Sequence, residues 1–352
     1  MHIVILADPV DNQLEGVHFY TKNLIKNLLK LDKKNSYSFI HLKSNKFFKN
    51  TRHYIIKDIS WIPGYGTIRK FILIPRLIKK LKPDAVIETQ HLGPFNIPQN
   101  IKRAQIIHDL TPILFPHFHI LNSVIMHKLF MNKIVQKSNL LIAVSKNTAK
   151  DIKKLFNYKN PIKIISPGIL PPSAAPLPSP LKKPYLLYLG TIEPRKNLEL
   201  LIRSFIELSL PHKLVLAGKI GWKSKKIIKL AHSHPNIILT GYLNEKNKAA
   251  YLKNAEAFIY PSHYEGFGLP PLEAMSYGTP VICSTGGSLK EIFNNYALMF
   301  NPNSKKELKS KITKLLNNNN LKESLSKKGQ IYSQNFNWHS AVSKLIAEFN
   351  KL

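Results

Sequence analysis

Cysteine is almost absent from this sequence, which has one, Cys283, in 352 residues. A single thiol excludes an internal disulfide and a cysteine-based zinc cluster, and it fits a reducing compartment. Apolar runs of membrane-spanning length are missing too. The opening segment MHIVILAD is apolar but short, lacks a basic leader and runs into an acid, so we expect a buried first strand rather than a signal peptide. These features predict a cytoplasmic protein.

Acidic residues are scarce: 20 aspartates and glutamates stand against 52 lysines and arginines, for a formal charge of +32. Three explanations are open, namely nucleic-acid binding, attachment to an anionic membrane face, and a lysine- and asparagine-biased composition. The basic residues are spread along the whole chain without an RNA- or DNA-binding motif, so we expect no nucleic-acid partner. Peripheral contact with the inner face of the cytoplasmic membrane stays open.

Aspartates are missing where a metal would need them. No Asp-x-Asp occurs anywhere, and no aspartate follows Asp151. Metal sites that hold phosphate groups are usually built from such carboxylates. We therefore expect no metal site, and positive charge supplied instead by side chains and helix N-termini.

What the sequence does contain is an alternation of short apolar runs and helical patterns, which is typical of an α/β chain. Expected strands are HIVILAD, YSFIHL, DAVIET, AQIIHDL and LLIAVS in the first half, and YLLYLG, KLVLAG, NIILTG, AEAFIYPS and PVICS in the second. Six prolines in residues 171–184 predict an extended linker between the halves. Two α/β units joined in this way would leave a cleft between them.

Helices are expected at residues 16–31, at residues 145–156 with Ser145 as N-cap, from about Asn197, and at residues 337–349. The run NNNN at residues 317–320 is interpreted as a loop between helices.

The stretch EGFGLPPLEAMSYG, residues 265–278, carries the strongest chemical signal. Pro271 suits a first helical turn and Gly278 the position after a helix end, which predicts a helix over residues 270–277. Gly266 and Gly268 would precede it, where bare amides and the positive helix end can receive phosphate. Glu273, in the first turn, could bind a ribose diol, and Glu265 could reach sugar hydroxyls. The alternative is a glycine-rich turn in which Glu273 only favours the helix dipole.

The turn in YLGTIEPRKNLELLI holds Glu193, Arg195 and Lys196 between a strand and a helix. Cations at that strand end would neutralise a diphosphate leaving group, and arginine can bind it bidentately. A solvated loop with an internal Glu193–Arg195 pair is the alternative.

Two weaker signals lie in the first half. Gly16 precedes a helix after the first strand, so its amide could approach phosphate, although no G-x-G-x-x-G is present. His108 and Asp109 follow a strand, where ligands gather in open α/β sheets. A structural or loop-capping role for this pair stays open, whereas a serine hydrolase is excluded because no G-x-S-x-G occurs.

In this order, the motifs GTIEPRKN, YPSHYEGFGLPPLEAMSYGTPVI and HDLTPILFP resemble the family-4 glycosyltransferases, and most of all a branch with many bacterial mannosyltransferases of surface-polysaccharide assembly. The resemblance covers nearly the whole chain. It implies the GT-B fold: two Rossmann-like α/β domains facing each other across a cleft. These would be an acceptor domain at 1–170, a linker at 171–184, a donor domain at 185–335, and a helix at 336–352 that returns to the first domain.

The resemblance also implies retaining transfer of a hexose from a nucleotide sugar, with GDP-mannose as the first expectation and a UDP-hexose as the second, and no cofactor. It assigns catalysis to Lys196, Arg195, Glu265 and His108, and places Asp109 on the acceptor side. Donor contacts would come from Gly16, Glu193, Gly218, Gly241, Tyr242, Gly266, Phe267, Gly268, Leu269 and Glu273. The chain departs from the family pattern at Glu15, where a second glycine is common, and at Thr191, where some members have arginine.

The sequence says less about the acceptor than about the donor, and we expect a glycan or a lipid-linked glycan. Residues 67–86, TIRKFILIPRLIKKLKPDAV, could form a basic amphipathic helix that rests on anionic lipid, or an ordinary helix packed on the sheet. Other functions are also open: an epimerase or phosphorylase of the same fold, although no pyridoxal-anchoring lysine is recognisable, or a basic RNA- or membrane-binding protein. The last would leave Glu265, Glu273 and the glycine loop unexplained.

Overall fold

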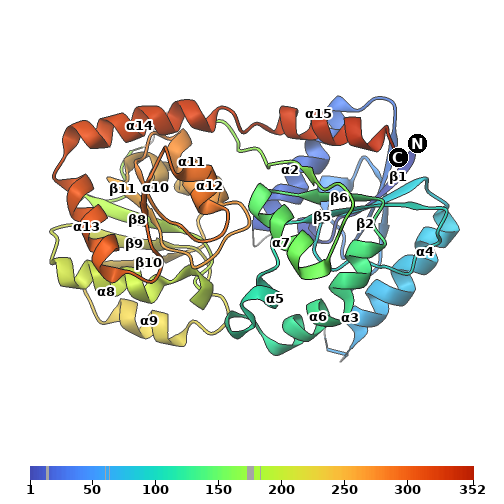
Figure 1. Cartoon of the computed structure of the whole chain (residues 1–352), viewed down its shortest axis with the longest axis horizontal. Coiled ribbons are helices and arrows are strands. Elements are labelled where there is room, and N and C mark those ends of the chain that lie inside the picture. The colour runs from blue at the N-terminus through green and yellow to red at the C-terminus, as the bar shows by residue number, and fades with distance from the viewer. Residues whose placement is uncertain (13–15, 60, 63, 173–177, 183) are drawn as a thin grey trace. The chain divides into compact units, whose positions relative to one another are not determined.

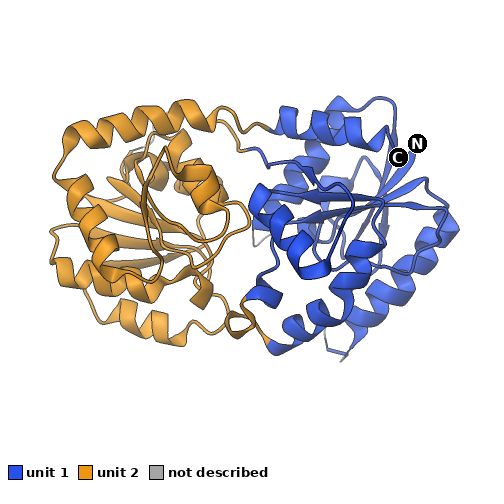
Figure 2. Ribbon diagram, viewed as in Figure 1, with its two compact units in different colours: residues 1–114, 121–168, 338–352 blue, residues 115–120, 169–337 orange. Residues whose placement is uncertain are grey.

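The computed structural model of the chain describes residues 1–12, 16–59, 61–62, 64–172, 178–182 and 184–352. They form two compact units (Figure 2). Unit 1 contains Met1–Leu114, Leu121–Gly168 and Trp338–Leu352, and unit 2 contains Phe115–Ile120 and Ile169–Asn337. Glu15 and part of the proline-rich linker, residues 173–177 and 183, lie outside the described residues.

Unit 1 is built on a sheet of seven parallel strands in the order β3-β2-β1-β4-β5-β6-β7. The central strands are nearly continuous apolar runs, as expected for a parallel sheet covered on both faces. The strands are β1 (His2–Leu6), β2 (Ser36–His41), β3 (Arg52–Ile55), β4 (Ala85–Glu88), β5 (Lys102–Ile107), β6 (Leu140–Ala143) and β7 (Lys163–Ile164).

The helices of unit 1 follow the sequence signals closely at two places. The second helix begins at Gly16, as expected, and Ser145 caps the seventh by accepting a hydrogen bond from the Thr148 amide at 3.0 Å. The helices are α1 (Pro9–Asn12), α2 (Gly16–Leu31), α3 (Tyr65–Ile68), a π-helix (Arg69–Leu73), α4 (Ile74–Leu81), α5 (Thr111–Leu114), α6 (Leu121–Gln136), α7 (Lys146–Phe156) and α15 (Trp338–Phe349) (Figure 1).

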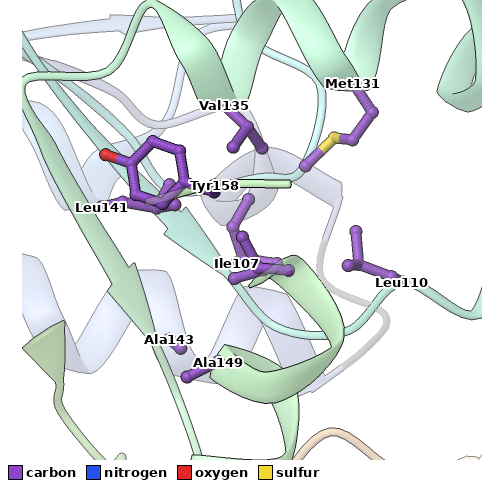
Figure 3. Close-up of a cluster of buried hydrophobic side chains, with 9 residues drawn as sticks. Ile107, Leu110, Met131, Val135, Leu141, Ala143, Ala149 and Tyr158 are labelled. Atoms are coloured by element: carbon purple, nitrogen blue, oxygen red, sulfur yellow. The ribbon is translucent and has the colours of Figure 1, made fainter. Parts of the chain in front are cut away.

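A buried apolar cluster fills the space where β5 and β6 meet α6 and α7 (Figure 3). Ile107 and Leu141 contribute from the strands, Met131 from α6 and Ile152 from α7, and all four are fully buried. Because Ile107 is the last residue of β5, this core holds the position from which His108 projects.

Unit 2 has a sheet of six parallel strands in the order β10-β9-β8-β11-β12-β13. Its strands are β8 (Tyr185–Leu189), β9 (Lys213–Ala217), β10 (Ile237–Gly241), β11 (Ala257–Tyr260), β12 (Val281–Ser284) and β13 (Leu298–Phe300). Its α-helices are α8 (Leu198–Leu208), α9 (Lys225–His232), α10 (Glu245–Asn254), α11 (Leu269–Ser276), α12 (Leu289–Phe293), α13 (Lys305–Leu316) and α14 (Asn319–Ser333) (Figure 1).

Unit 2 also takes in a short piece of the first half of the sequence, Phe115–Ile120. The ring of Phe118 stacks on His263 with centroids 5.2 Å apart, and its carbonyl accepts a hydrogen bond from the indole of Trp222. Phe115 contacts Tyr264, with ring centroids 5.4 Å apart. This segment therefore packs against the loops that follow β9 and β11.

One expectation from the sequence is wrong. The asparagine run is not all loop, because Asn319 begins α14 and the Asn318 side chain caps it by accepting from the Leu321 amide. Of the two interpretations of residues 67–86, the packed helix holds for α4, because Ile74 and Ile78 are buried in a core cluster with residues of β1 and β4. Ile68 and Ile72, which precede α4 in the same stretch, are more than two-fifths exposed, and membrane contact through them stays a prediction.

Candidate active site

The sheet of unit 2 has a topological switch point between β8 and β11. From β8 the chain adds β9 and β10 on one side, and it then adds β11, β12 and β13 on the other side of β8. In open α/β sheets, ligands bind outside the carboxyl ends of the strands at such a switch point. The turn after β8 holds Glu193, Arg195 and Lys196, and the loop after β11 holds Glu265. The topology thus brings two motifs about seventy residues apart to one place.

These residues form a compact ionic network. Lys196 Nζ lies 2.6 Å from Glu265 Oε1, and Arg195 Nη1 lies 3.1 Å from Glu265 Oε2. The other Arg195 nitrogen, Nη2, lies 2.8 Å from Glu193 Oε1, and Lys196 also donates to the Tyr260 hydroxyl at 3.0 Å. Two cations and two anions therefore compensate one another, and the two cations meet on one carboxylate.

The network is buried rather than solvated. Glu193 is 1% exposed, Lys196 7% and Glu265 8%, so the alternative of a solvated loop around a Glu193–Arg195 pair is wrong, although that pair does form. Burial alone would raise the pKa of Glu265, but the charges of Arg195 and Lys196 outweigh it and hold the pKa below its ordinary value. Glu265 is therefore an anion at neutral pH, held in place by both cations.

Three glycines form the neighbouring edge of the sheet, at the ends of β8, β9 and β10. Gly218 has φ +139°, and a Cβ there would lie 2.0 Å from the carbonyl oxygen of Gly190. The Gly218 amide in turn donates to the Gly241 carbonyl at 2.9 Å. Only glycine permits this approach of backbones. The next residue, Tyr242, is 63% exposed at the same edge.

The glycine loop leads into α11, which runs over Leu269–Ser276, within one residue at each end of the expected helix. Gly268 is the N-cap, with φ +105°, and a Cβ there would collide with Leu289 and Phe293. Pro270 and Pro271 have no amide hydrogen, so Phe267, Gly268 and Leu269 carry the amides at this positive helix end.

Glu273 lies in the second turn of α11, not in the first as expected, because the helix begins one residue earlier than the sequence indicated. Its Oε1 lies 3.3 Å from Lys248 Nζ on α10. Burial raises the pKa of Glu273, and the attraction of Lys248 offsets only part of that rise. Glu273 thus has a specific charge partner, and a role limited to the helix dipole does not describe it.

In unit 1, His108 and Asp109 follow β5, as expected. His108 Nε2 contacts the Thr89 carbonyl at 2.9 Å, and the ring of Tyr20 meets its ring edge-on at 4.6 Å. Burial lowers the pKa of His108, so its imidazole is neutral at pH 7. Asp109 Oδ1 accepts from the amide and hydroxyl of Thr111, which is the capping role that the sequence left open.

Gly16 begins α2 and is exposed, with no atom within 4 Å of a Cβ built at that position. It lies in unit 1, as do His108 and Asp109, whereas the other predicted site residues lie in unit 2.

Sequence reasoning missed several charged and polar residues near these positions. Lys248 and Tyr260 complete the contacts of Glu273 and Lys196. Lys248 lies in no recognisable motif, and Tyr260 opens the motif YPSHYEGFGLPPLEAMSYGTPVI but has no role assigned from the sequence. At the switch point of unit 1, between β1 and β4, Arg69 is 2% exposed and forms a two-pronged ion pair with Asp8, at 2.6 and 2.7 Å. Such pairings join distant parts of the chain, so sequence spacing carries no signal for them.

Within the described ranges, no group of three or more histidine, cysteine, aspartate or glutamate side chains is placed to hold a metal ion. In the same part of the chain, no helix combines the length and apolar character required to cross a bilayer.

Two family models divide the chain between them. The model of Glycosyltransferase Family 4 matches residues 15–171, and that of Glycosyl transferases group 1 matches residues 172–332. The chain belongs to the family-4 glycosyltransferases. It is an enzyme, a hexosyltransferase of the GT-B fold.

Individual relatives and solved structures agree. O-antigen chain mannosyltransferase B of Escherichia coli is 26% identical over an alignment that covers 100% of both chains. Serotype-specific mannosyltransferase WbdA, also of E. coli, is 28% identical over 280 residues, 73% of this chain but only 34% of that longer protein. The solved structure of sucrose-phosphate synthase from Thermosynechococcus elongatus superposes with a TM-score of 0.80, covering 100% of this chain and 98% of that one, at 17% identity. The last likeness shows the shared fold.

Proposed function

We propose that this glycosyltransferase moves mannose from GDP-mannose, with retention of configuration, to a glycan or lipid-linked glycan of a surface polysaccharide. The carrying observation is the buried network in which Lys196 and Arg195 both hold Glu265 at the switch point of unit 2. The choice of mannose is supported by the names of two E. coli relatives, both mannosyltransferases, one of them of the O-antigen chain.

The donor would lie along the carboxyl edge of the unit 2 sheet. Open space at Gly241, where an added Cβ would have no atom within 4 Å, leaves room for a nucleoside close to the strand ends, and the exposed ring of Tyr242 offers a surface for the base. Glu273 can accept from two ribose hydroxyls because its carboxylate has acceptor sites beyond the contact with Lys248. The diphosphate then reaches Lys196, Arg195 and the start of α11.

The ionic network also indicates how the donor would be received. Without ligand, the charges of Lys196 and Arg195 are compensated by Glu265 and Glu193. An incoming diphosphate competes for the two cations, and each exchange releases a Glu265 oxygen that can accept from hexose hydroxyls. Glu265 would thus change from a partner of the cations to a partner of the sugar, while the cations stay preorganised for the leaving group.

The transfer itself needs one bond broken and one formed on the same face of the sugar. The bond between the anomeric carbon and the β-phosphate oxygen breaks, and the acceptor oxygen bonds to that carbon. The departing phosphate oxygen takes the acceptor proton. Lys196 and Arg195 stabilise the charge that develops on the diphosphate, and their fixed positions supply the orientation. The neutral imidazole of His108 would lie beside the sugar.

A thermal-shift series with GDP, UDP and ADP tests the donor, followed by turnover of GDP-mannose and UDP-hexoses with product anomers assigned by NMR. We expect the largest stabilisation with GDP, turnover of GDP-mannose in the presence of a chelator, and an α-linked product from the α-linked donor. If UDP alone stabilises the enzyme, the donor at this site is a UDP-hexose and not GDP-mannose. If no nucleoside diphosphate stabilises the enzyme, or one does so only with manganese, the proposed site is wrong.

A further inference from the structure

Helix α6 presents large apolar side chains to solvent. Leu121 is 73% exposed, Ile125 44% and Leu129 60%. A spacing of four residues places them along one face of the helix. The opposite face is already satisfied, because Met131 and Ile134 are fully buried in unit 1. Packing in the core of unit 1 therefore does not explain why Leu121, Ile125 and Leu129 are apolar.

A second exposed group lies on the segment before α4. Trp61 is 80% exposed, and Ile68 and Ile72 are more than two-fifths exposed. This segment touches α6: the ring of Phe71 in the π-helix lies 4.7 Å from that of Phe130, and Phe95 packs on both. The two groups thus belong to neighbouring elements of unit 1. We call them the α3–α6 surface, made of Trp61, Ile68, Ile72, Leu121, Ile125 and Leu129.

Isolated exposed apolar residues are ordinary, but clustering is not. Six of the fifteen large apolar side chains that are exposed in the described residues belong to the α3–α6 surface. Such a concentration on two touching elements indicates a contact surface.

The charge around this surface is mainly positive, although the exposed Asp58 and Asp84 flank the first of its two segments. Residues 61–83 and 121–137 contain no aspartate or glutamate. Apart from Arg69, which is buried and paired with Asp8, they contain eight basic residues: Lys70, Arg76, Lys79, Lys80, Lys82, Lys128, Lys133 and Lys137. Lys133 and Lys137 each lie 5.7 Å from the centre of the Phe95 ring, so their charges adjoin the aromatic link between the two groups. A partner that matches this surface would have a negatively charged outer layer and an apolar interior directly beneath it.

We propose that the α3–α6 surface docks unit 1 on an anionic lipid bilayer. The apolar side chains would enter the boundary between head groups and acyl chains, and the lysines would meet the lipid phosphates. Trp61 would lie at the interface, where tryptophan is enriched in membrane proteins. The surface uses residues other than the apolar face of α4, which is buried. This proposal does not depend on which sugar the enzyme transfers.

Flotation of the nuclease-treated full chain with lipid vesicles tests it. We expect co-flotation with phosphatidylcholine vesicles that contain phosphatidylglycerol, a large loss of co-flotation at high salt, and little binding to phosphatidylcholine alone. The fluorescence of the wild-type chain should shift to the blue with anionic vesicles, and Trp61→Phe should remove most of that shift.

Matched variants separate this surface from the general positive charge. Changing Lys128, Lys133 and Lys137 to Gln should lower the partition coefficient on the order of 100-fold, because each surface lysine contributes about fivefold. The same change at three exposed lysines of unit 2, Lys306, Lys314 and Lys328, removes equal charge and should have a much smaller effect. Leu129→Ser should cost roughly fivefold, while Ile331→Ser on α14, at 69% exposure, should cost nothing.

Three results would overturn the proposal. The chain could fail to float with anionic vesicles. Both lysine triples could weaken binding equally, which would assign the attraction to net charge. Light scattering could show a dimer that Leu129→Ser converts to a monomer, with no effect of that variant on vesicle binding, which would make the surface an interface between two copies.

Discussion

Lys196→Ala is the most informative single change, because it separates stability from chemistry. The side chain is buried, and its ammonium lies 2.6 Å from Glu265. Removal of one partner from a buried pair leaves a charge uncompensated and commonly costs 3–5 kcal/mol. Arg195 still binds the other Glu265 oxygen at 3.1 Å, so we expect about 3 kcal/mol of lost unfolding free energy, at the lower end of that range.

The effect on turnover should be much larger than any loss of folded enzyme explains. Removal of one donor to a developing anion typically lowers kcat on the order of 10²–10³-fold. Urea unfolding gives the stability, and turnover of the donor at a temperature where the variant is folded gives kcat.

The double variant Lys196→Ala/Glu265→Gln is the decisive control. Glu265→Gln neutralises the carboxylate that the first change left underpaired, so it should restore about 1–2 kcal/mol of stability. Because Glu265 is itself proposed to bind the sugar, the reference for kcat is Glu265→Gln alone. The double variant returns no cation to the diphosphate, so its kcat should stay well below that of Glu265→Gln. If the double variant turns over as fast as Glu265→Gln, or if Lys196→Ala alone turns over near the wild-type rate, Lys196 acts on the fold and not on the leaving group.

Three further predictions concern the frame around the site. Gly218→Ala should destabilise unit 2 by more than about 2 kcal/mol in urea unfolding, because its Cβ would meet the carbonyl of Gly190, directly after β8, at a positive φ. Gly16→Ala, with open space around its Cβ, should leave stability within about 0.5 kcal/mol. Burial raises the pKa of Glu88 to about 7, so the folded chain holds a proton that the unfolded chain has lost, and stability should fall as pH rises from about 4.5 to 7. Glu88→Gln should remove that slope and raise stability at pH 8, and an unchanged slope would show that Glu88 is ionised in the folded chain. Ser145→Ala should cost about 1 kcal/mol through loss of the α7 cap, and an equal melting temperature would contradict this.

Local signals predicted the elements well where they agreed with packing. Helix α2 begins at Gly16 and ends at Leu31 as expected, and Ser145 caps α7. The signals were less reliable at ends that packing decides. Helix α11 begins at Leu269, one residue early, so Glu273 falls in its second turn. Side-chain capping by Asn318 lets α14 start inside the asparagine run.

Residues 67–86 were ambiguous for a physical reason. An apolar stripe with basic flanks is equally consistent with a helix that packs on a sheet and with a helix that lies on lipid. The sheet supplies the partner for Ile74 and Ile78. The sequence did not indicate the exposed apolar row on α6, because sequence alone does not tell which apolar side chains are buried.

By itself the sequence determined the class of the enzyme, because short motifs such as EPRKN and EGFGLPPLE keep their chemistry within a few residues of chain. It also determined the α/β alternation, which follows from hydrophobic periodicity. Only the tertiary structure decided that Lys196 and Arg195 share the carboxylate of Glu265, that Lys248 partners Glu273, and that Gly218 lies against Gly190. Strand order decides these contacts, and strand order is set by packing across the whole sheet rather than by any local stretch of residues.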